Sequence, residues 1–285
     1  MRAKDRTLNI AMDLYWLEQT ESDVPSNNDW LGPHEAACLA AMRFLNRRSD
    51  WRLGRWTAKQ ALATCLNLST NLSDLANLEI RAASSGAPEV FIDSQPARIA
   101  ISLSHRAGTA MCTVGAPNSN FGCDLEMVEA RSPAFVEDYF TTDEQALIAD
   151  IPLPERSLLL ALLWSAKESV LKALRVGLRL DTRCMSVKPS RVSHALAADL
   201  TVWHPLSIRY SSTQTFSGWW RLEADLVRTV VSDVLLQAPL PARKAASLES
   251  PFDKKPRKPF RGDNTCWGRI DGTDYASRCR RFLEL

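Results

Sequence analysis

Residues 121–126 read FGCDLE, a run that predicts a β-strand with Asp124 placed two residues before Glu126. Successive side chains of a strand point to opposite faces, so the two carboxylates share one face. Taken alone, an Asp-x-Glu pair is most often a solvated strand edge. Taken as a site, it is half of what binds a hard metal ion, because such ions prefer oxygen ligands.

Residues 164–172 read WSAKESVLK and end a long helix that is apolar on one side. Glu168 and Lys172 are four positions apart, so they lie on the same helix face one turn from each other. The plainer interpretation is a surface ion pair with little effect on stability. Three carboxylates and a lysine together suit Mg²⁺ on a polyphosphate, since Mg²⁺ takes few protein ligands and completes its octahedron with water and phosphate oxygens.

The order and spacing of the two stretches together match a known signature. Gly-x-Asp-x-Glu followed by Trp-x-x-Lys-Glu-Ser-x-x-x-Lys resembles the 4'-phosphopantetheinyl transferase superfamily, in particular its two-lobed group related to the surfactin-synthetase activator. Further matches are ISLSH at residues 101–105, FTTDE at residues 140–144 and LGPHE at residues 31–35. The resemblance spans about residues 8–235.

The resemblance implies a fold and a domain organisation. The expected fold class is α+β, as a pseudo-dimer of two similar α+β lobes with the active site at their interface. We expect an N-terminal lobe over residues 1–118, a C-terminal lobe with the metal and catalytic motifs over residues 119–237, and a basic, flexible tail over residues 238–285. No internal repeat is obvious in the sequence, so the doubling depends on the resemblance.

The resemblance also implies a reaction. Members of this superfamily transfer the 4'-phosphopantetheine arm of coenzyme A to a serine of an apo carrier protein, with Mg²⁺, and release adenosine 3',5'-bisphosphate. The expected partners are coenzyme A and the acyl or peptidyl carrier domains of nonribosomal peptide or polyketide synthases, which belong to antibiotic biosynthesis and other secondary metabolism.

Two other classes of function remain open. A metal-dependent phosphohydrolase also uses clustered acids and a lysine, but it normally needs more acids or histidines, and the chain has 4 histidines. A non-catalytic protein that binds coenzyme A or the carrier does not need the set of three acids. Product analysis separates the three classes.

The resemblance assigns roles to individual residues of this sequence. The predicted metal ligands are Asp124, Glu126 and Glu168. The predicted catalytic residues are Glu144, Glu168 and Lys172. One of the two glutamates takes the proton of the acceptor serine, and the lysine offsets charge on the phosphates. Metal ligation lowers basicity, which favours Glu144 over Glu168 as the base. The predicted coenzyme-binding residues are Arg48, Arg52, Ser104, His105 and Lys172.

Three positions depart from the pattern of the two-lobed group. Ala37, Ala40 and Ala87 stand where its members often have basic residues, so some usual anchors of the coenzyme's 3'-phosphate are missing. A guanidinium group binds phosphate well, and six arginines are available as substitutes. They are Arg47, Arg48, Arg52, Arg55, Arg81 and Arg106.

The composition is ordinary for a globular protein, with 45% hydrophobic and 24% charged residues. A formal net charge of +2 is too small to indicate nucleic-acid binding. The longest apolar run, residues 158–164, is too short to span a bilayer, and no signal-peptide core follows the first residues. The 7 cysteines include no Cys-x-x-Cys pair and indicate free thiols in a reducing compartment. We expect a cytoplasmic monomer that contacts neither nucleic acid nor membrane.

The hydrophobic pattern predicts the elements around these motifs. Helices are expected at residues 33–45, 53–66, 133–139, 143–149 and 154–175. Thr142 or Asp143 is the expected cap of the helix at residues 143–149. Strands are expected at residues 10–16, 90–92, 99–103, 111–114, 121–126, 206–210 and 219–227, with residues 229–236 extending the last of them.

Overall fold

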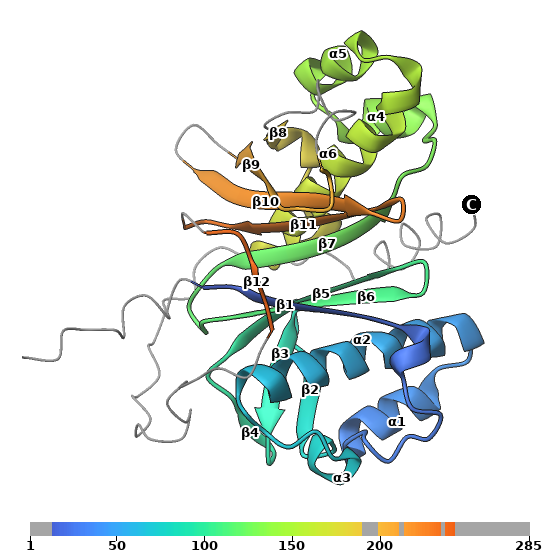
Figure 1. Ribbon diagram of the computed structural model, residues 1–285, viewed down its shortest axis with the longest axis vertical. Helices are drawn as coiled ribbons and strands as arrows, with labels where there is room; N and C mark the ends of the chain where they lie inside the picture. The colour runs from blue at the N-terminus through green and yellow to red at the C-terminus, as the bar shows by residue number, and fades with distance from the viewer. Residues whose placement is uncertain (1–12, 190–198, 211–213, 235–236, 243–285) are drawn as a thin grey trace, which may run out of the picture. The chain divides into compact units, whose positions relative to one another are not determined.

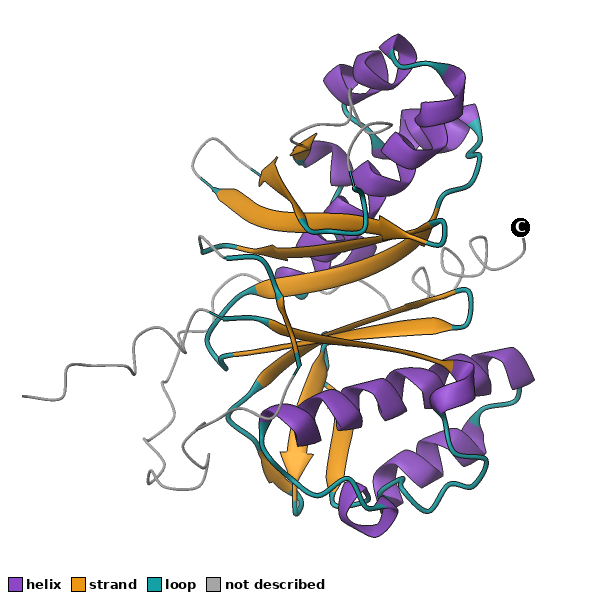
Figure 2. Cartoon of the chain, viewed as in Figure 1, coloured by secondary structure: helices purple, strands orange, loops and turns teal. Residues whose placement is uncertain are grey.

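The structure is a computed structural model that describes residues 13–189, 199–210, 214–234 and 237–242. The fold class is α+β, as predicted, and it contains three sheets. The two larger sheets each carry one long helix on their outer face (Figures 1 and 2). Within the described ranges, every helix is too short or too polar to cross a membrane.

The first large sheet joins the N-terminal strand to two strands from the middle of the chain and to one short strand near residue 240. Its order is β12-β1-β6-β5, and all neighbours are antiparallel except β12 and β1. The strands are β1 (Tyr15–Thr20), β5 (Ala100–Arg106), β6 (Thr109–Gly115) and β12 (Leu240–Pro241). Helix α2 (Leu45–Cys65) covers one face, where Leu62 packs against Ile101 and Val114 in a common core.

Smaller elements complete this half of the described chain. A sheet of order β2-β3-β4 lies beside α2. Two shorter helices precede this sheet along the chain. These elements are α1 (Pro33–Ala41), α3 (Leu72–Leu75), β2 (Leu78–Ala82), β3 (Pro88–Ile92), β4 (Gln95–Pro96) and the 3-10 turn Glu21–Asp23.

The second large sheet has the order β7-β11-β10-β9-β8, with every neighbouring pair antiparallel. Helix α6 (Leu153–Ala173) packs on β7 and β11. The strands are β7 (Phe121–Met127), β8 (Ser186–Pro189), β9 (His204–Arg209), β10 (Thr215–Glu223) and β11 (Leu226–Ser232). Between β7 and β8 lie also α4 (Pro133–Tyr139), α5 (Thr142–Asp150) and the 3-10 turns Gly177–Arg179 and Thr182–Cys184.

A layer of apolar side chains lies between the two large sheets. Met111 of the first sheet belongs to one core with Phe121, Cys123, Leu125 and Val230 of the second. Cys123 is fully buried and serves as a small core residue. Since Cys123 and Leu125 face this core, Asp124 and Glu126 point to the other face of β7, toward α6.

Both halves of the described chain contain the same kind of buried ion pair. In the first half, Glu35 is the third residue of α1, and its Oε2 lies 2.6 Å from Lys59 Nζ of α2. In the second half, Glu144 is the third residue of α5, and its Oε2 lies 2.7 Å from Lys167 Nζ of α6. Each glutamate also caps its own helix, and α2 and α6 both have 21 residues.

Each pair also ties its helices to the outer strand of a sheet. Oε1 of Glu35 accepts a hydrogen bond from the Ile80 N–H of β2 at 3.0 Å, and Oε1 of Glu144 accepts one from the Val187 N–H of β8 at 2.9 Å. Buried charges are tolerated only when they are paired and hydrogen-bonded in this way. Each pair therefore holds two helices and one strand together.

Several boundaries differ from the sequence-based prediction. Helix α4 has the predicted bounds, whereas α2 begins at Leu45 and not at residue 53. Residues 46–50 read NRRSD and contain no apolar side chain, so no periodicity reveals the start of α2. The cap of α5 is Thr141, whose Oγ1 accepts from the Glu144 N–H at 3.2 Å, and not Thr142 or Asp143.

The predicted strand over residues 219–227 is in fact two strands joined by a hairpin. Ala224 and Asp225 both have positive φ, which turns β10 back as β11. The predicted tail over residues 238–285 also needs a correction, because Leu240 and Pro241 pair with Tyr15 and Trp16 of β1. The remainder of that segment, residues 243–285 with its basic run, lies outside the described residues.

Candidate active site

Three acidic side chains lie together where β7 meets α6. Asp124 and Glu126 belong to β7, and Glu168 belongs to the C-terminal part of α6. The charge of Asp124 acts on both glutamates, so the three lie within electrostatic reach of one another. We call these three residues the acidic cluster. The structure thus brings the three predicted metal ligands into one neighbourhood.

Gly122 allows α6 to lie directly on β7. A Cβ atom at this position would be 1.9 Å from the carbonyl oxygen of Ser169, so a side chain would push the helix off the strand. Two hydroxyl groups of α6 then bind β11, because Ser165 Oγ and Ser169 Oγ lie 2.8 and 2.7 Å from Thr229 Oγ1. These contacts fix the position of Glu168 over the strand.

Asp124 is buried, and its two carboxylate oxygens have different surroundings. Oδ1 accepts hydrogen bonds from Ser104 Oγ and from Lys172 Nζ, each at 2.8 Å. Oδ2 is buried as well, yet it has no hydrogen-bond partner among the described residues. A buried carboxylate oxygen without a partner is unfavourable, and a metal ion is one group that would satisfy it.

Glu126 has a partner for each of its oxygens. Oε1 accepts from the indole Nε1 of Trp164 at 3.0 Å, and Oε2 accepts from the guanidinium of Arg131 at 2.9 Å. Burial first, and the charge of Asp124 second, raise the pKa of Glu126 to about 7, although Arg131 and Arg106 lower it. Glu126 is therefore held in place from both sides.

Glu168 and Lys172 complete the group on the helix side. Burial and then the charge of Asp124 raise the pKa of Glu168 to about 7, while Lys172 lowers it. Burial lowers the pKa of Lys172, but the charges of Asp124 and Glu168 and the hydrogen bond to Asp124 together outweigh burial, so the pKa is raised. Its ammonium donates to Asp124 Oδ1 and to the Cys123 carbonyl at 3.0 Å. An ammonium has three donors, so one N–H remains for a ligand.

The donor set of the acidic cluster fits Mg²⁺. In the described part of the chain, no group of three His, Cys, Asp or Glu side chains is arranged to hold a metal ion by itself. Mg²⁺ does not need one, because it is usually held by one or two carboxylates and takes its other ligands from water and phosphate. Asp124 Oδ2 is the first candidate ligand, with Glu168 beside it. Each oxygen of Glu126 already accepts a hydrogen bond, from Trp164 or from Arg131.

Glu144, the favoured base in the sequence-based prediction, is not brought into the acidic cluster. Its Oε1 accepts from Val187 N–H, and its Oε2 accepts from Thr141 N–H at 2.9 Å and pairs with Lys167. These bonds use both oxygens to join α5, α6 and β8. Among the described residues, Glu144 thus joins elements of the fold, and both of its oxygens already accept hydrogen bonds.

The two arginines predicted to bind the coenzyme are engaged by the backbone. Arg48 donates to the carbonyl oxygens of Leu39 and Met42, at 2.6 and 3.2 Å, and so caps the C-terminal end of α1. Arg52 donates to the Asn27 carbonyl at 3.0 Å. Arg48 is held through Nη1 and Arg52 through Nη2, so each guanidinium keeps further N–H donors.

Ser104 and His105 end strand β5 beside the acidic cluster, and they point to opposite faces of the strand. Ser104 faces Asp124, as its hydrogen bond shows. Desolvation lowers the pKa of His105. The charge of Asp50 of α2 raises this pKa in part, and the charge of Lys172 lowers it further. The structure therefore separates the two side chains that the sequence-based prediction placed on one phosphate, and it adds an acid, Asp50, next to His105.

Two further residues of the site had no predicted role. Trp164 lies in the quoted stretch at residues 164–172, and its indole N–H proves to be the partner of Glu126. Arg131 contacts Glu126 and also Glu129, at 2.9 and 3.1 Å. A tryptophan at a helix position signals packing more often than hydrogen bonding, and nothing in the sequence distinguishes Arg131 from other arginines.

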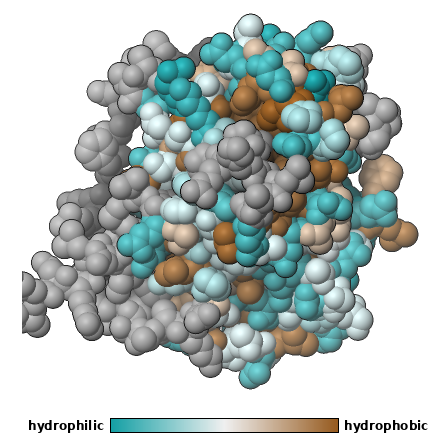
Figure 3. All heavy atoms as spheres, turned by 45° about the horizontal axis from the view of Figure 1, so that its top comes forward, coloured by the Kyte–Doolittle hydropathy of each residue, from teal (hydrophilic) through white to brown (hydrophobic). Residues whose placement is uncertain are grey.

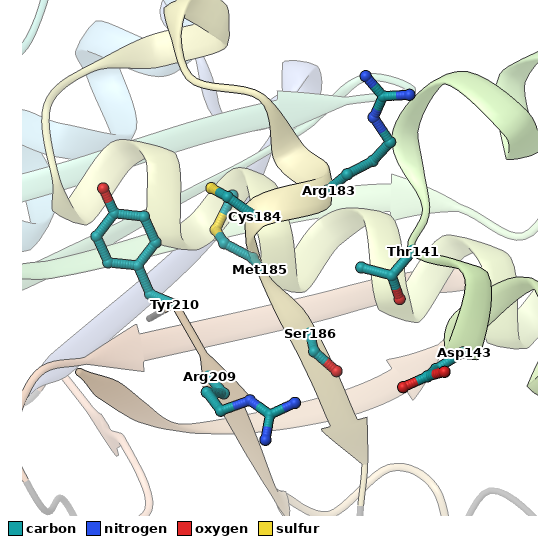
Figure 4. Close-up of a pocket in the computed structure, with 8 residues that line it drawn as sticks. All are labelled: Thr141, Asp143, Arg183, Cys184, Met185, Ser186, Arg209 and Tyr210. Carbon is teal, nitrogen blue, oxygen red and sulfur yellow. The ribbon is translucent and has the colours of Figure 1, made fainter. Parts of the chain in front are cut away.

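A separate hollow of about 180 Å³ lies at the start of α5 (Figure 4). It is lined by Thr141, Asp143, Arg183, Cys184, Met185, Ser186, Arg209 and Tyr210. Arg183 points away from the other labelled side chains and pairs with Asp181 at 2.9 Å. No residue of the acidic cluster lines this hollow, so it is distinct from the candidate active site.

Apolar side chains gather on the upper part of the face that Figure 3 shows. In the described chain, Leu147 of α5 is 41% exposed and Leu153, the first residue of α6, is 74% exposed. A patch of exposed apolar side chains, unlike scattered single ones, is typical of a surface that contacts another protein.

One region of the chain matches a known protein family. Residues 120–227 match the family model of the 4'-phosphopantetheinyl transferase superfamily. The matched region begins just before β7 and includes all of α6, so it contains the whole acidic cluster and Lys172. The match to the superfamily is thereby confirmed for the region that carries the two opening motifs.

Two solved structures are similar to parts of the chain. Holo-[acyl-carrier-protein] synthase from Helicobacter pylori, in complex with coenzyme A, is 16% identical over 36% of this chain and 98% of its own, with a TM-score of 0.29. Holo-[acyl-carrier-protein] synthase from Thermotoga maritima is 18% identical over 44% of this chain and 73% of its own, with a TM-score of 0.31. Scores of this size add nothing to the description of the fold. None of the curated proteins compared with the chain matches it.

We expect Mg²⁺ to raise the melting temperature more at about pH 8 than at about pH 6. In the metal-free protein the pKa values of Glu126 and Glu168 are raised from 4.5 to about 7. Protonation of these groups therefore stabilises the folded state at low pH, and this stabilisation is lost as the pH rises from about 4.5 through about 7. A cation competes with the same protons, so its effect grows over this range. Melting curves with MgCl₂ or with NaCl of equal ionic strength measure it, and equal shifts at both pH values would contradict it.

Proposed function

We propose that this chain is a 4'-phosphopantetheinyl transferase that modifies a serine of an apo carrier protein, with coenzyme A as the donor. The serine oxygen forms a bond to the β-phosphorus of coenzyme A, the bond from that phosphorus to the bridging oxygen breaks, and adenosine 3',5'-bisphosphate leaves. The observation that carries the proposal is the acidic cluster inside the superfamily domain, with the buried Asp124 Oδ2 lacking a partner among the described residues.

The acidic cluster and Lys172 would act on the pyrophosphate. Asp124 Oδ2 would hold Mg²⁺, which would supply positive charge that offsets the repulsion between the pyrophosphate and the attacking oxygen. Lys172 keeps its ammonium charged, because Asp124 raises its pKa, and its remaining N–H can donate to a phosphate oxygen. In this position it offsets charge that develops on the leaving group.

We place the general base at Glu168, with Asp124 as the ligand of the cation, because a carboxylate that binds the metal loses basicity. No hydrogen bond to the Glu168 carboxylate is found within the described ranges, so its oxygens are free to accept a proton. A pKa of about 7 also suits a group that takes a proton near neutral pH. The contacts of Glu144 argue against the alternative, since its oxygens already bind Thr141, Lys167 and Val187.

We infer that the chain is a pseudo-dimer of an N-terminal lobe, residues 1–118, and a C-terminal lobe, residues 119–237, with the site between them. The repeated ion pairs Glu35–Lys59 and Glu144–Lys167 support this, as do the two helices of equal length. The strand pairing is also repeated, because β1-β6-β5 and β7-β11-β10 have the same antiparallel order. The site draws Ser104 from the first lobe and the acidic cluster from the second.

The acceptor that we propose is an acyl or peptidyl carrier domain of a nonribosomal peptide or polyketide synthase, which places the reaction in secondary metabolism. A chain with two fused lobes needs no second subunit to complete its site, so we propose a monomer. Coenzyme A and such carriers occur in the cytoplasm, where we place the protein.

The test is a transfer assay with the full chain, coenzyme A, Mg²⁺ and a panel of apo carrier proteins. We expect one phosphopantetheinyl increment on the carrier by intact-protein mass spectrometry, and none on a carrier whose acceptor serine is replaced by alanine. A hydrolase would release phosphopantetheine or phosphate without labelling the carrier, and a binding protein would do neither. Folded enzyme that binds Mg²⁺ but labels no member of the panel would overturn the proposal.

Dephospho-coenzyme A provides a second arm of the same assay. Its pyrophosphate is intact, and only contacts to the 3'-phosphate are lost. With Ala37, Ala40 and Ala87 in place of basic residues, and with Arg48 and Arg52 bound to carbonyl groups, we expect it to be a useful donor with a mild penalty. A severe loss of rate with this donor would show that other cations bind the 3'-phosphate strongly.

A further inference from the structure

Two serine side chains of β5 accept hydrogen bonds from backbone N–H groups of β7, where a neighbouring strand would offer carbonyl oxygens. Ser102 Oγ accepts a hydrogen bond from the Cys123 N–H at 3.0 Å, and Ser104 Oγ accepts one from the Leu125 N–H at 3.2 Å. Both serines are buried, at 4% and 8% exposure, so water does not compete for these bonds. We call this pair of contacts the serine seam. It joins the two large sheets beside the acidic cluster.

The two hydroxyls of the serine seam differ in one respect. A hydroxyl has a single proton, and accepting an N–H leaves that proton available to another acceptor. Ser104 gives its proton to Asp124 Oδ1 at 2.8 Å. No corresponding bond from Ser102 Oγ to a carboxylate is found among the described residues. Ser104 therefore binds the backbone of β7 at Leu125 and orients the side chain of Asp124 at the same time.

We propose that Ser104 is a positioning residue for Asp124, which holds Oδ1 together with Lys172 so that Oδ2 is turned toward the cation. This inference deepens the proposed function and rests on it. It replaces the expected contact between Ser104 and the coenzyme's 3'-phosphate, since the hydroxyl already uses its proton on Asp124 and a lone pair on Leu125. Groups that orient a metal ligand in this way typically change metal affinity by about 10- to 100-fold.

The serine seam contains its own matched control. Ser102→Ala and Ser104→Ala each remove one buried hydroxyl and leave one β7 N–H without its acceptor, so we expect similar losses of stability. Only Ser104→Ala also removes a hydrogen bond to Asp124 Oδ1, which then keeps Lys172 alone. We expect Mg²⁺ to bind Ser104→Ala about 10- to 100-fold more weakly than it binds the wild-type protein, while Ser102→Ala retains wild-type affinity.

The experiment is titration calorimetry of Mg²⁺ into the full chain without coenzyme, with the wild-type transfer assay run in parallel. Ser104→Thr keeps the hydroxyl and should restore the affinity, because a β-branched residue is well tolerated in a strand. Ser104→Cys fills the same space with a weaker donor and should lie between wild type and Ser104→Ala, which provides a second reading where the alanine variant folds poorly.

Three results would overturn the inference. One is equal weakening of Mg²⁺ binding in Ser102→Ala and Ser104→Ala, which would show a general effect of the seam. Another is unchanged Mg²⁺ affinity with weaker coenzyme binding in Ser104→Ala, which would show that Ser104 binds the 3'-phosphate of coenzyme A. The third is a wild-type protein that transfers the arm but binds no Mg²⁺ at Asp124. A wild-type protein that binds Mg²⁺ and transfers nothing contradicts the proposed function while leaving the role of Ser104 intact.

Discussion

Asp124→Asn should lower the rate of phosphopantetheinyl transfer by at least about 10²-fold, because it removes the carboxylate oxygen that we assign to the cation. Asn keeps an acceptor at Oδ1 for Ser104 and Lys172, but it places an amide N–H₂ where Oδ2 now lies buried without a partner among the described residues. The fold should therefore persist while Mg²⁺ no longer raises the melting temperature. Initial rates over a range of Mg²⁺ concentrations, together with melting curves, measure both effects.

Glu129→Gln is the matched control for this substitution. It removes the same charge just beyond the end of β7, from a side chain that is 43% exposed and paired with Arg106 and Arg131. Exposed ion pairs contribute little, so we expect only a small change in rate and in melting temperature. Near-normal turnover in Asp124→Asn, or an equal loss of transfer rate in Glu129→Gln, would show that Asp124 does not bind the catalytic cation.

Glu144→Ala should lower the free energy of unfolding by about 3–5 kcal/mol, which is the usual effect of removing one partner of a buried ion pair. Lys167 is fully buried, and without Glu144 its ammonium keeps only the carbonyl oxygens of Tyr139 and Thr182, at 3.0 and 2.9 Å. The substitution also removes the side-chain acceptor of the Thr141 N–H, which is one of the two hydrogen bonds of the capping box. Urea denaturation of the variant and the wild-type protein measures the difference.

Two controls separate this structural role from a catalytic one. Glu137→Ala removes an exposed acid from the neighbouring helix α4 and should leave the free energy of unfolding nearly unchanged. Glu144→Leu combined with Lys167→Met replaces the pair by apolar side chains and should recover much of the lost stability. Full wild-type stability in Glu144→Ala, with a large loss of transfer rate, would restore Glu144 as the base in place of Glu168.

Local patterns were sufficient for most of the helices and for the strand that carries the acids. Helix α4 has the predicted bounds, and α6 differs from its prediction by one residue at the start and two at the end. Strand β7 extends one residue beyond the predicted range. These segments combine a proline or an apolar run with a clear periodicity, which are the signals that persist without tertiary context.

The elements that sequence reasoning missed lack such signals. The hairpin between β10 and β11 turns at Ala224 and Asp225, where positive φ would normally be signalled by glycine or asparagine. Thr141 and Glu144 do form a Thr-x-x-Glu pattern, which indicates a capping box, but the same residues also fitted the family's catalytic motif. The position of Lys167 opposite Glu144, which only the tertiary structure reveals, favours the structural interpretation.

The sequence by itself determined which residues carry charge and in which order. The spacing of Asp124 and Glu126 places them on one strand face, and the spacing of Glu168 and Lys172 places them on one helix face, because strands and helices have fixed periods. Gly122 is part of the same local pattern, and the structure shows that it leaves room for α6 on β7.

Only the tertiary structure decided which carboxylate oxygens are free. Asp124 Oδ1 is occupied by Ser104 of β5 and Lys172 of α6, Glu126 by Trp164 and Arg131, and Glu144 by its cap, Lys167 and β8. Several of these partners come from distant parts of the chain, so no window of sequence contains both ends of those hydrogen bonds. The chemical role of a carboxylate depends on which of its lone pairs are already used, and that is settled by packing rather than by spacing.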